Sequence, residues 1–208
     1  MGHPSPESSL TRHVDYYFAP QSPWTYLGHQ RFAEMVRSAQ VTLRVLPVDM
    51  GRIFPISGGL PLAKRAPQRQ AYRLVELKRF SEHLQLPLNL HPRFFPVASD
   101  DAARLITAVA LHDGADAAMA LTGAVLRAVW AEERNIADAQ VLGELLAECR
   151  LAPVRLDESR GDAVQARYQA HTQEAIEAGV FGAPSYVIDG ELFWGQDRLD
   201  FVQRRLQS

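Results

Sequence analysis

The chain has 208 residues, of which 47% are hydrophobic and 22% charged, and its formal net charge is -2. This is the composition of an ordinary globular protein, and a chain of this length can bury a substantial core. No basic run, Arg204-Arg205 included, is longer than two residues, so nothing indicates nucleic-acid binding. The single cysteine, Cys149, excludes an internal disulfide and a Cys-x-x-Cys redox centre.

The N-terminal residues are polar and rich in Pro and Ser, and they lack the apolar core of a signal peptide. No apolar run is long enough to span a membrane. We therefore expect a cytoplasmic protein without membrane association, with a flexible arm over residues 1–13. The histidines show no metal-ligand spacing, so we expect no metal site.

The first predicted elements are a strand, a helix and a second strand. Val14 to Phe18 is a β-branched and aromatic run, and Pro23 follows where a helix would begin. The apolar pattern predicts a helix from Pro23 to about Ser38 and a strand over residues 41–48. Such a β-α-β unit is nearly always right-handed with parallel strands, which indicates an α/β sheet.

Residues after this unit are predicted to be helical. A loop rich in Gly and Pro, over 51–61, opens the segment, and one helix is expected over 157–179, ended by Gly179. Between them, apolar residues keep helical spacing in Ala-rich surroundings. These residues are Leu74, Leu77, Phe80, Leu84, Leu105, Val109, Leu121, Val125, Val129, Leu142, Leu145, Leu146 and Cys149.

The C-terminal segment returns to strands. Ser185 to Ile188 and Glu191 to Trp194 flank Asp189-Gly190, which is typical of a tight hairpin, and a short helix follows over about 197–206. We therefore predict one small α/β domain interrupted by an all-helical insertion domain. The expected boundaries are 14–50 and 180–208 for the discontinuous domain and 51–179 for the insertion.

Two short motifs at opposite ends indicate which α/β fold this is. Ser22-Pro23-Trp24-Thr25 follows the first strand, and Phe181-Gly182-Ala183-Pro184 precedes the third. Together they suggest a thioredoxin-like fold, in which a Cys-x-x-Cys tetrad sits at a helix N-terminus that favours a thiolate. Ser22 and Thr25 stand where the two thiols would be. Such a site can receive a thiolate from a ligand such as glutathione.

At this point the chain resembles the 2-hydroxychromene-2-carboxylate isomerases and their relatives, the kappa-class glutathione transferases. The resemblance covers almost everything after residue 13, and the stretch from Leu62 to Pro96 is more similar to the isomerase branch. Its carriers are Asp15-Tyr16-Tyr17-Phe18, Ser22-Pro23-Trp24-Thr25-Tyr26-Leu27, Ala128-Val129-Trp130, the segment from Thr172 to Pro184, and Trp194-Gly195-Gln196-Asp197-Arg198.

The resemblance implies roles for several residues. The Ser22 hydroxyl would donate a hydrogen bond to the glutathione thiolate, although a serine before proline is also an ordinary helix N-cap. Ala183-Pro184 resembles a cis-proline element, whose alanine backbone would pair with the cysteinyl part of glutathione. Asp197 would meet the γ-glutamyl amino group, with help from the Gln196 backbone, and its structural alternative is an N-cap of the last helix.

The chain also departs from the family. An asparagine that relatives often carry after the second strand is replaced by Gly59, so one side-chain contact to glutathione or substrate is missing. We expect Trp24 and Trp194 to line an aromatic substrate pocket, and Arg93 to hold a substrate carboxylate, with Lys64 as a further candidate. A solvated surface role is the alternative for both cations.

The resemblance implies a glutathione-dependent isomerase of a small aromatic carboxylic acid from aromatic-compound breakdown, acting as a homodimer. The expected reaction converts 2-hydroxychromene-2-carboxylate, or a close analogue, to trans-o-hydroxybenzylidenepyruvate. A kappa-like glutathione transferase or peroxidase would instead consume glutathione. A thioredoxin-like binding module without chemistry is the third possibility, and Gly59 is the one feature in its favour.

Overall fold

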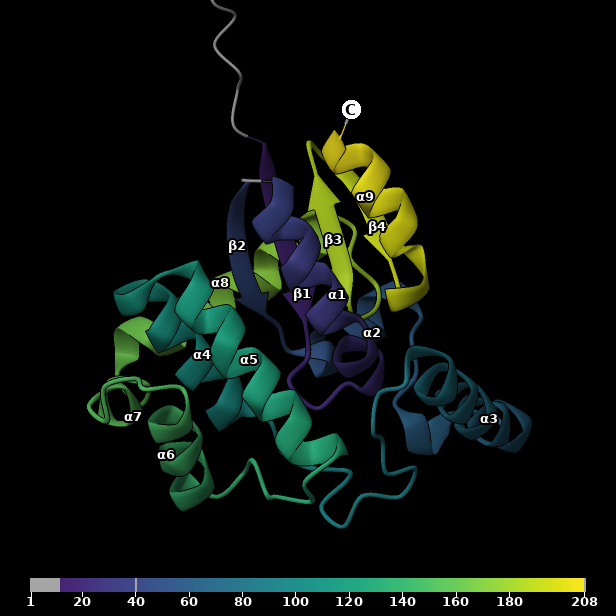
Figure 1. Ribbon diagram of the computed structural model, residues 1–208, viewed down its shortest axis with the longest axis horizontal. Helices are drawn as coiled ribbons and strands as arrows, with labels where there is room; N and C mark the ends of the chain where they lie inside the picture. The colour runs from purple at the N-terminus through teal and green to yellow at the C-terminus, as the bar shows by residue number, and fades with distance from the viewer. Residues whose placement is uncertain (1–11, 40, 208) are drawn as a thin grey trace, which may run out of the picture.

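The computed structural model describes residues 12–39 and 41–207, and within them it contains one four-stranded sheet. Its order is β2-β1-β3-β4, so the N-terminal and C-terminal segments lie side by side (Figure 1). β1 and β2 are parallel, whereas β3 is antiparallel to both β1 and β4. The strands are β1 (His13–Phe18), β2 (Thr42–Pro47), β3 (Ser185–Ile188) and β4 (Glu191–Trp194).

Helices connect and cover the strands. α1 joins β1 to β2, α9 follows β4, and all the other α-helices lie in the chain between β2 and β3. Their bounds are α1 (Pro23–Ala39), α2 (Met50–Ser57), α3 (Pro67–Leu84), α4 (Asp100–Asp113), α5 (Ala115–Trp130), α6 (Ala139–Glu148), α7 (Arg155–Glu158), α8 (Asp162–Glu177) and α9 (Leu199–Gln207), with 3-10 turns η1 (Leu62–Lys64) and η2 (Gln196–Arg198). This is the predicted α/β fold with a helical insertion.

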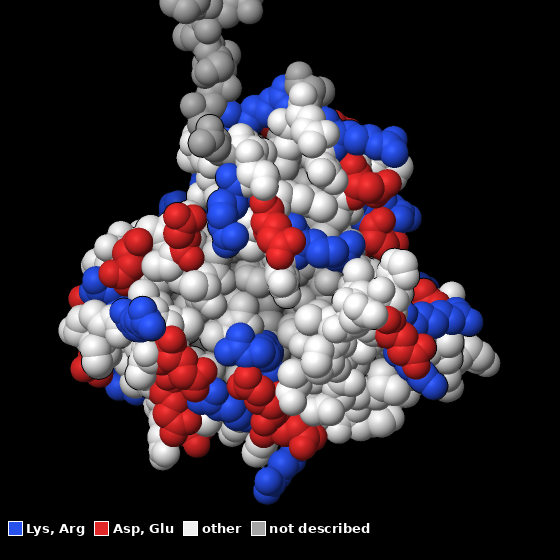
Figure 2. All heavy atoms as spheres, viewed as in Figure 1, with Lys and Arg blue, Asp and Glu red and all other residues white. Residues whose placement is uncertain are grey.

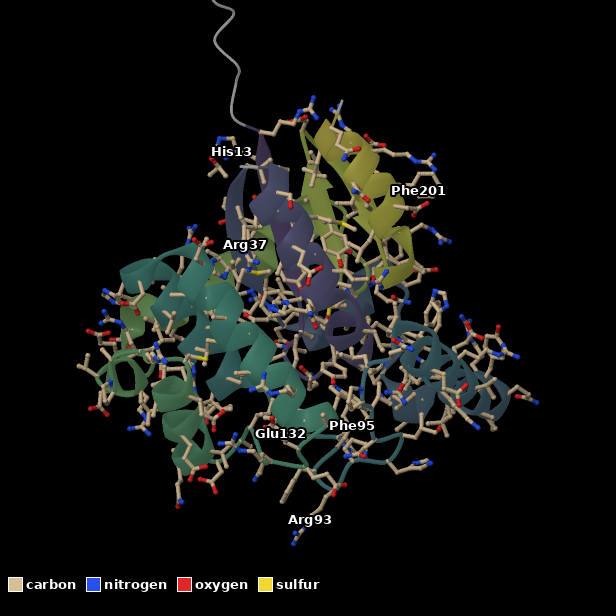
Figure 3. All side chains as sticks on the ribbon, in the orientation of Figure 1. His13, Arg37, Arg93, Phe95, Glu132 and Phe201 are labelled. Atoms are coloured by element: carbon tan, nitrogen blue, oxygen red, sulfur yellow. The ribbon has the colours of Figure 1, made fainter. Side chains whose placement is uncertain are left out.

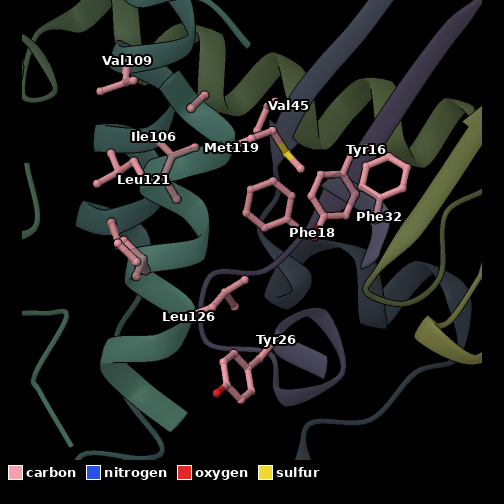
Figure 4. Close-up of a cluster of buried hydrophobic side chains, with 14 of the residues drawn as sticks. Tyr16, Phe18, Tyr26, Phe32, Val45, Ile106, Val109, Met119, Leu121 and Leu126 are labelled. Carbon is pink, nitrogen blue, oxygen red and sulfur yellow. The ribbon is translucent and has the colours of Figure 1, made fainter. Parts of the chain in front are cut away.

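The alternation of side chains along β1 divides the core into two clusters. Tyr16 and Phe18 point to one face, where they pack with residues of α1, α4, α5 and α9. Tyr17 points to the other face and packs with Ile53 of α2 and Ala175 of α8. Figure 4 shows the larger cluster, which continues from the sheet into the helices of the insertion. The domain boundaries at 50/51 and 179/180 stay a prediction.

The structure differs from the sequence prediction in two places. A helix, α2, forms inside the predicted Gly/Pro-rich loop, because the Asp49 carboxylate accepts from the Gly51 N–H at 2.7 Å and Gly58 ends the helix in the left-handed region. The helix expected over 157–179 is also interrupted, since α7 ends at Glu158 and α8 begins only at Asp162.

The predicted hairpin and last helix are confirmed. Asp189 and Gly190 both have positive φ, as a two-residue hairpin turn requires, and η2 and α9 follow. The arm predicted over residues 1–13 lies outside the described residues except for its last two, of which His13 already belongs to β1.

α3 stands on one side of the α1 start and α4 to α7 stand on the other (Figure 1). Contacts tie these parts together: the Trp24 ring meets the Phe80 ring edge-on at 6.2 Å, and the Tyr26 hydroxyl donates to the Pro87 carbonyl at 2.6 Å. Basic and acidic side chains are interspersed on the face seen in Figure 2. In the part of the chain that the structure describes, no helix is long and apolar enough to cross a membrane.

Candidate active site

Three segments meet at one end of the sheet. β1 runs into the loop before α1, and its register places Tyr17 opposite Ser185, so the Ala183-Pro184 segment lies beside the chain that leads to Ser22. The Gly195 N–H donates to the Pro184 carbonyl at 2.9 Å, which brings the turn after β4 to the same place. The topology thus gathers Ser22, the Ala183-Pro184 segment and the turn before Gln196 at the start of α1.

Ser22 combines a capping role with a free donor. Its Oγ accepts a hydrogen bond from the Thr25 N–H at 3.2 Å, so the N-cap reading is correct. The hydroxyl hydrogen makes no hydrogen bond within the described residues, and the side chain is half-buried. No acidic side chain occupies the first turn of α1, so nothing there offsets the positive end of the helix dipole.

The backbone beside Ser22 offers one further donor. Pro23 has no N–H, and the Thr25 and Tyr26 N–H groups are used by Ser22, whereas the Trp24 N–H has no partner among the described residues. Thr25, at the second of the two thiol positions, is fully buried and its hydroxyl is unpartnered. A ligand thiolate at this helix start would meet the Ser22 hydroxyl and the Trp24 N–H.

Ala183 offers an unpaired stretch of backbone. The Ala183-Pro184 peptide bond is cis, which confirms the resemblance to a cis-proline element. Neither the N–H nor the C=O of Ala183 is hydrogen-bonded within the described chain, although Ser185 donates from its Oγ to the Gly182 carbonyl at 2.8 Å. An extended peptide can therefore pair with Ala183 as a strand pairs with a neighbour.

Gln196 is fixed by an arginine that the sequence analysis did not single out. The Arg31 guanidinium donates to the Gln196 backbone carbonyl at 3.1 Å and also to its side-chain oxygen. Gln196 is buried against α1 at Gly28, where an added Cβ would stand 2.8 Å from the Gln196 Cβ. A glycine inside a helix was the signal available in the sequence.

Asp197 is exposed and pairs with its own neighbour. Its carboxylate lies 2.9 Å from the Arg198 guanidinium, and both side chains are about half exposed. Gly195 stands at the N-cap position, and Asp197 makes no capping hydrogen bond within the described chain. The carboxylate is thus accessible to a cationic group of a ligand, which would compete with Arg198.

The two tryptophans predicted to line the pocket lie in different settings. Trp194 is 51% exposed, and its indole covers Gly182 so closely that an added Cβ there would lie 2.2 Å from Nε1. Phe181 packs against it with ring centroids 4.8 Å apart. Trp24 is half-buried against Phe80 of α3. Trp194 therefore borders the Ala183 segment, and Trp24 packs against α3.

Two other sequence-predicted positions lie away from this constellation. A Cβ added to Gly59 would be 2.3 Å from the Phe54 ring, so that ring fills the space that an asparagine side chain would need. Arg93 is exposed, and its guanidinium lies 5.2 Å from the centre of the Phe94 ring. Figure 3 shows Arg93 pointing away from the body of the molecule. A carboxylate-binding role for Arg93 stays a prediction.

The buried histidines serve the core. His29 links Tyr16, whose hydroxyl donates to Nδ1 at 3.2 Å, to the Met119 carbonyl, which accepts from Nε2–H at 2.9 Å. Burial lowers the pKa of His29 to about 4, so the ring is neutral at physiological pH. Among the described residues, no group of three His, Cys, Asp or Glu side chains is arranged to hold a metal ion.

A groove of about 500 Å³ runs between α1 and α5. Tyr26, His29 and Met119 line it, whereas Ser22, Ala183 and Asp197 do not. The catalytic candidates thus lie outside this groove.

A four-stranded sheet whose first helix is preceded by Ser22-Pro23-Trp24-Thr25 in place of a Cys-x-x-Cys tetrad defines a thioredoxin-like protein without the cysteine pair. The sequence profile described as a DSBA-like thioredoxin domain matches residues 13–207. The chain is 32% identical to a 2-hydroxychromene-2-carboxylate isomerase of Pseudomonas sp. (strain C18), over 91% of this chain and 88% of that protein. The chain belongs to the DSBA-like thioredoxin family and, within it, to the 2-hydroxychromene-2-carboxylate isomerase family.

Two further comparisons agree with this placement. A solved structure of a 2-hydroxychromene-2-carboxylate isomerase superposes with a TM-score of 0.75 and 25% identity, covering 94% of each chain. Human glutathione S-transferase kappa 1 is more distant, at 26% identity over 95% of this chain and 92% of that protein. The predicted similarity to the isomerases, with the kappa transferases further away, is confirmed.

Proposed function

We propose that this protein is a glutathione-dependent cis-trans isomerase that converts 2-hydroxychromene-2-carboxylate, or a close analogue, to trans-o-hydroxybenzylidenepyruvate. The observation that carries the proposal is the start of α1, where the Ser22 hydroxyl and the Trp24 N–H are unpaired donors beside the unpaired backbone of Ala183. The isomerases at about 30% identity support the reaction type.

The residues present fit glutathione. The Ala183 N–H and C=O can pair with the cysteinyl residue of the tripeptide, which directs its thiol toward the start of α1. The Asp197 carboxylate can take the γ-glutamyl ammonium group, and the buried Gln196, held by Arg31, fixes the backbone on which Asp197 stands. The kappa transferase among the relatives supports the same cofactor.

Glutathione, when bound, supplies a thiolate that adds reversibly to a conjugated carbon-carbon double bond, so that the bond can rotate before the thiolate leaves. Ser22 holds the negative charge on sulfur by donating its hydroxyl hydrogen, and the Trp24 N–H and the helix dipole add to this. Stabilisation of about 1 kcal/mol lowers a thiol pKa by somewhat less than one unit, which raises the thiolate fraction near neutral pH.

A kappa-like glutathione transferase or peroxidase is the second candidate, favoured by the 26% identity to the human kappa enzyme. Glutathione would then be consumed. A thioredoxin-like binding module without chemistry is the third, and the replacement of the family asparagine by Gly59 is the observation in its favour. Product analysis separates the first two, because an isomerase leaves the thiol unchanged and a transferase releases a conjugate.

The test is a calorimetric titration with reduced glutathione, followed by the assay of 2-hydroxychromene-2-carboxylate with and without it. We expect saturable binding, and isomer formation that requires glutathione without consuming it. Isomerisation at full rate without glutathione would overturn the cofactor, and binding without any turnover would favour the binding module.

From the same resemblance we propose a cytoplasmic homodimer that acts in aromatic-compound breakdown. Light scattering of the purified protein tests the dimer, which a monomeric mass at micromolar concentration would contradict.

A further inference from the structure

Arg73 on α3 is a half-buried cation without an anionic partner. Its Cζ lies 5.4 Å from the centre of the Phe95 ring and 5.8 Å from that of Trp130. Within the described chain Arg73 makes no ion pair and no hydrogen bond. Other half-buried arginines differ, since Arg44 reaches Asp15 at 3.3 Å.

The electrostatic setting of Arg73 is unfavourable for an unpaired charge. Burial and, to a smaller extent, the positive charge of the neighbouring Arg65 together lower the pKa of Arg73 to about 10. Arg65 itself donates to the Leu60 carbonyl at 2.8 Å and neutralises nothing. A carboxylate placed here would remove both penalties.

The Phe95 and Trp130 rings also bring a second donor without a partner in the described chain, the indole N–H of Trp130. Trp130 is fully buried at the end of α5, and among residues 12–39 and 41–207 its indole N–H has no hydrogen-bond acceptor. Such a group costs about 1–3 kcal/mol when left unpaired, so it is uncommon in a folded protein. Phe95 packs on Trp130 with ring centroids 4.8 Å apart, and Figure 3 shows Phe95 between the end of α5 and α3.

This region adjoins the start of α1. Trp24, two residues after Ser22, meets Phe80, and Phe80 follows Arg73 by two turns on the same face of α3, or about 10 Å along the helix. The Asn89 N–H donates to the Trp130 carbonyl at 2.7 Å, and the Tyr26 hydroxyl donates to the Pro87 carbonyl. The segment that contains Pro87 and Asn89 therefore links the end of α5 to α1.

We propose that Arg73, together with the indole N–H of Trp130, binds the carboxylate of the aromatic acid substrate and so selects acids over neutral analogues. The guanidinium fork can hold both carboxylate oxygens and the indole N–H can complete their coordination, while the Phe95 ring borders the aromatic part. The inference rests on the proposed function for the identity of the substrate, and it replaces the exposed Arg93 as the carboxylate anchor.

The test measures calorimetric binding of 2-naphthoate and of its neutral analogue 2-naphthamide, without glutathione, to the purified full-length protein. We expect the wild type to bind 2-naphthoate more tightly by on the order of 10- to 100-fold. Arg73→Gln should abolish this preference, and Trp130→Phe, which keeps a ring but removes the N–H, should reduce it several-fold. Arg69→Gln is the matched control, because Arg69 is exposed on the same helix one turn earlier.

Equal binding of the two probes to the wild type, or an unchanged preference in Arg73→Gln, would overturn the proposal. A purely structural role of Arg73 predicts equal weakening of both probes, and that result would overturn it as well. The outcome is independent of the cofactor: a protein that prefers 2-naphthoate through Arg73 but binds no glutathione contradicts the proposed function alone. Glutathione binding without any carboxylate preference contradicts the Arg73 site alone.

Discussion

The sheet side and the helical side of the site present different kinds of group. At the end of the sheet the free groups are mainly backbone ones, those of Trp24 and Ala183, together with the Ser22 hydroxyl. On the helical side they are side chains, Arg73 and Trp130, brought together from α3 and α5. Backbone pairing accepts a peptide whatever its side chains, whereas a fixed cation selects charge. Under the two proposals above, the sheet side binds the peptide cofactor and the helical side binds the acidic substrate.

Leu77→Ala should destabilise α3, which carries Arg73 on the helical side, and this variant has the largest expected effect. Leu77 is the one fully buried side chain of α3, and truncating a buried leucine costs about 2–5 kcal/mol. The free energy of unfolding from urea denaturation should fall by this amount, or α3 should open separately. Hydrogen exchange decides between them, because local opening raises the exchange of α3 amides and leaves those of α5 protected. Unchanged stability and exchange would show that α3 is held by other contacts.

The same comparison explains what the sequence could predict. The sheet side consists of short contiguous motifs, Ser22-Pro23 and Ala183-Pro184, next to predicted strands, so the sequence pattern indicates their place in the fold, and the family resemblance implies their roles. The helical side depends on packing between distant segments, which periodicity does not define. Leu77 at i+4 from Arg73 placed that arginine near the buried face of its helix, yet only the packing shows Phe95 and Trp130 beside it.

Helix α2 and the role of Arg31 could not be predicted for a related reason. The helix α2 depends on a single side-chain cap at Asp49, which outweighs the Gly and Pro content that predicts a loop. Arg31 is one of many helix-surface arginines in the sequence, and only the close approach at Gly28 makes it the residue that fixes Gln196.

Ser22→Ala tests the sheet side directly. Loss of one hydrogen bond to a thiolate should lower kcat/KM of the glutathione-dependent isomerisation on the order of 10- to 100-fold and move its pH profile to higher pH. Glutathione affinity should change little, since Ala183 and Asp197 remain. The measurement is steady-state kinetics with calorimetry of glutathione.

Because Ser22 also caps α1, its removal costs about 0.5–2 kcal/mol of stability. Asp138→Ala is the matched control, since Asp138 caps α6 by accepting from the Gln140 N–H at 2.9 Å. The control should lose comparable stability and keep its rate. A parallel loss of rate in both variants would assign the effect of Ser22 to folding.

His29 on α1 links β1 to α5 through Tyr16 and Met119, and it gives a pH-dependent prediction. Its pKa in the folded protein is about 4, below the ordinary 6.5, so the unfolded chain takes up the proton first as the pH falls. The contribution of His29 to stability is therefore complete above about pH 6.5 and is lost as the pH falls toward 4.

Between pH 8 and pH 5, urea denaturation of the wild type should show a loss of unfolding free energy about 2 kcal/mol larger than in His29→Gln. The comparison with the variant removes the contribution of His171, whose pKa burial also lowers to about 4. Parallel pH curves for the two proteins would contradict this role of His29.

Substitutions in the Asp197–Arg198 pair have the smallest expected effects, but the two variants should change glutathione affinity in opposite directions. Its pair with Arg198 is about half exposed, and exposed pairs contribute about 0.2–1 kcal/mol, or less than roughly tenfold in affinity. Asp197→Asn should weaken glutathione binding a few-fold in calorimetry, whereas Arg198→Gln should tighten it, because it releases the carboxylate for the ligand ammonium. If the pair only stabilised the turn after β4, both changes would weaken binding. Opposite signs therefore identify Asp197 as a ligand contact on the sheet side.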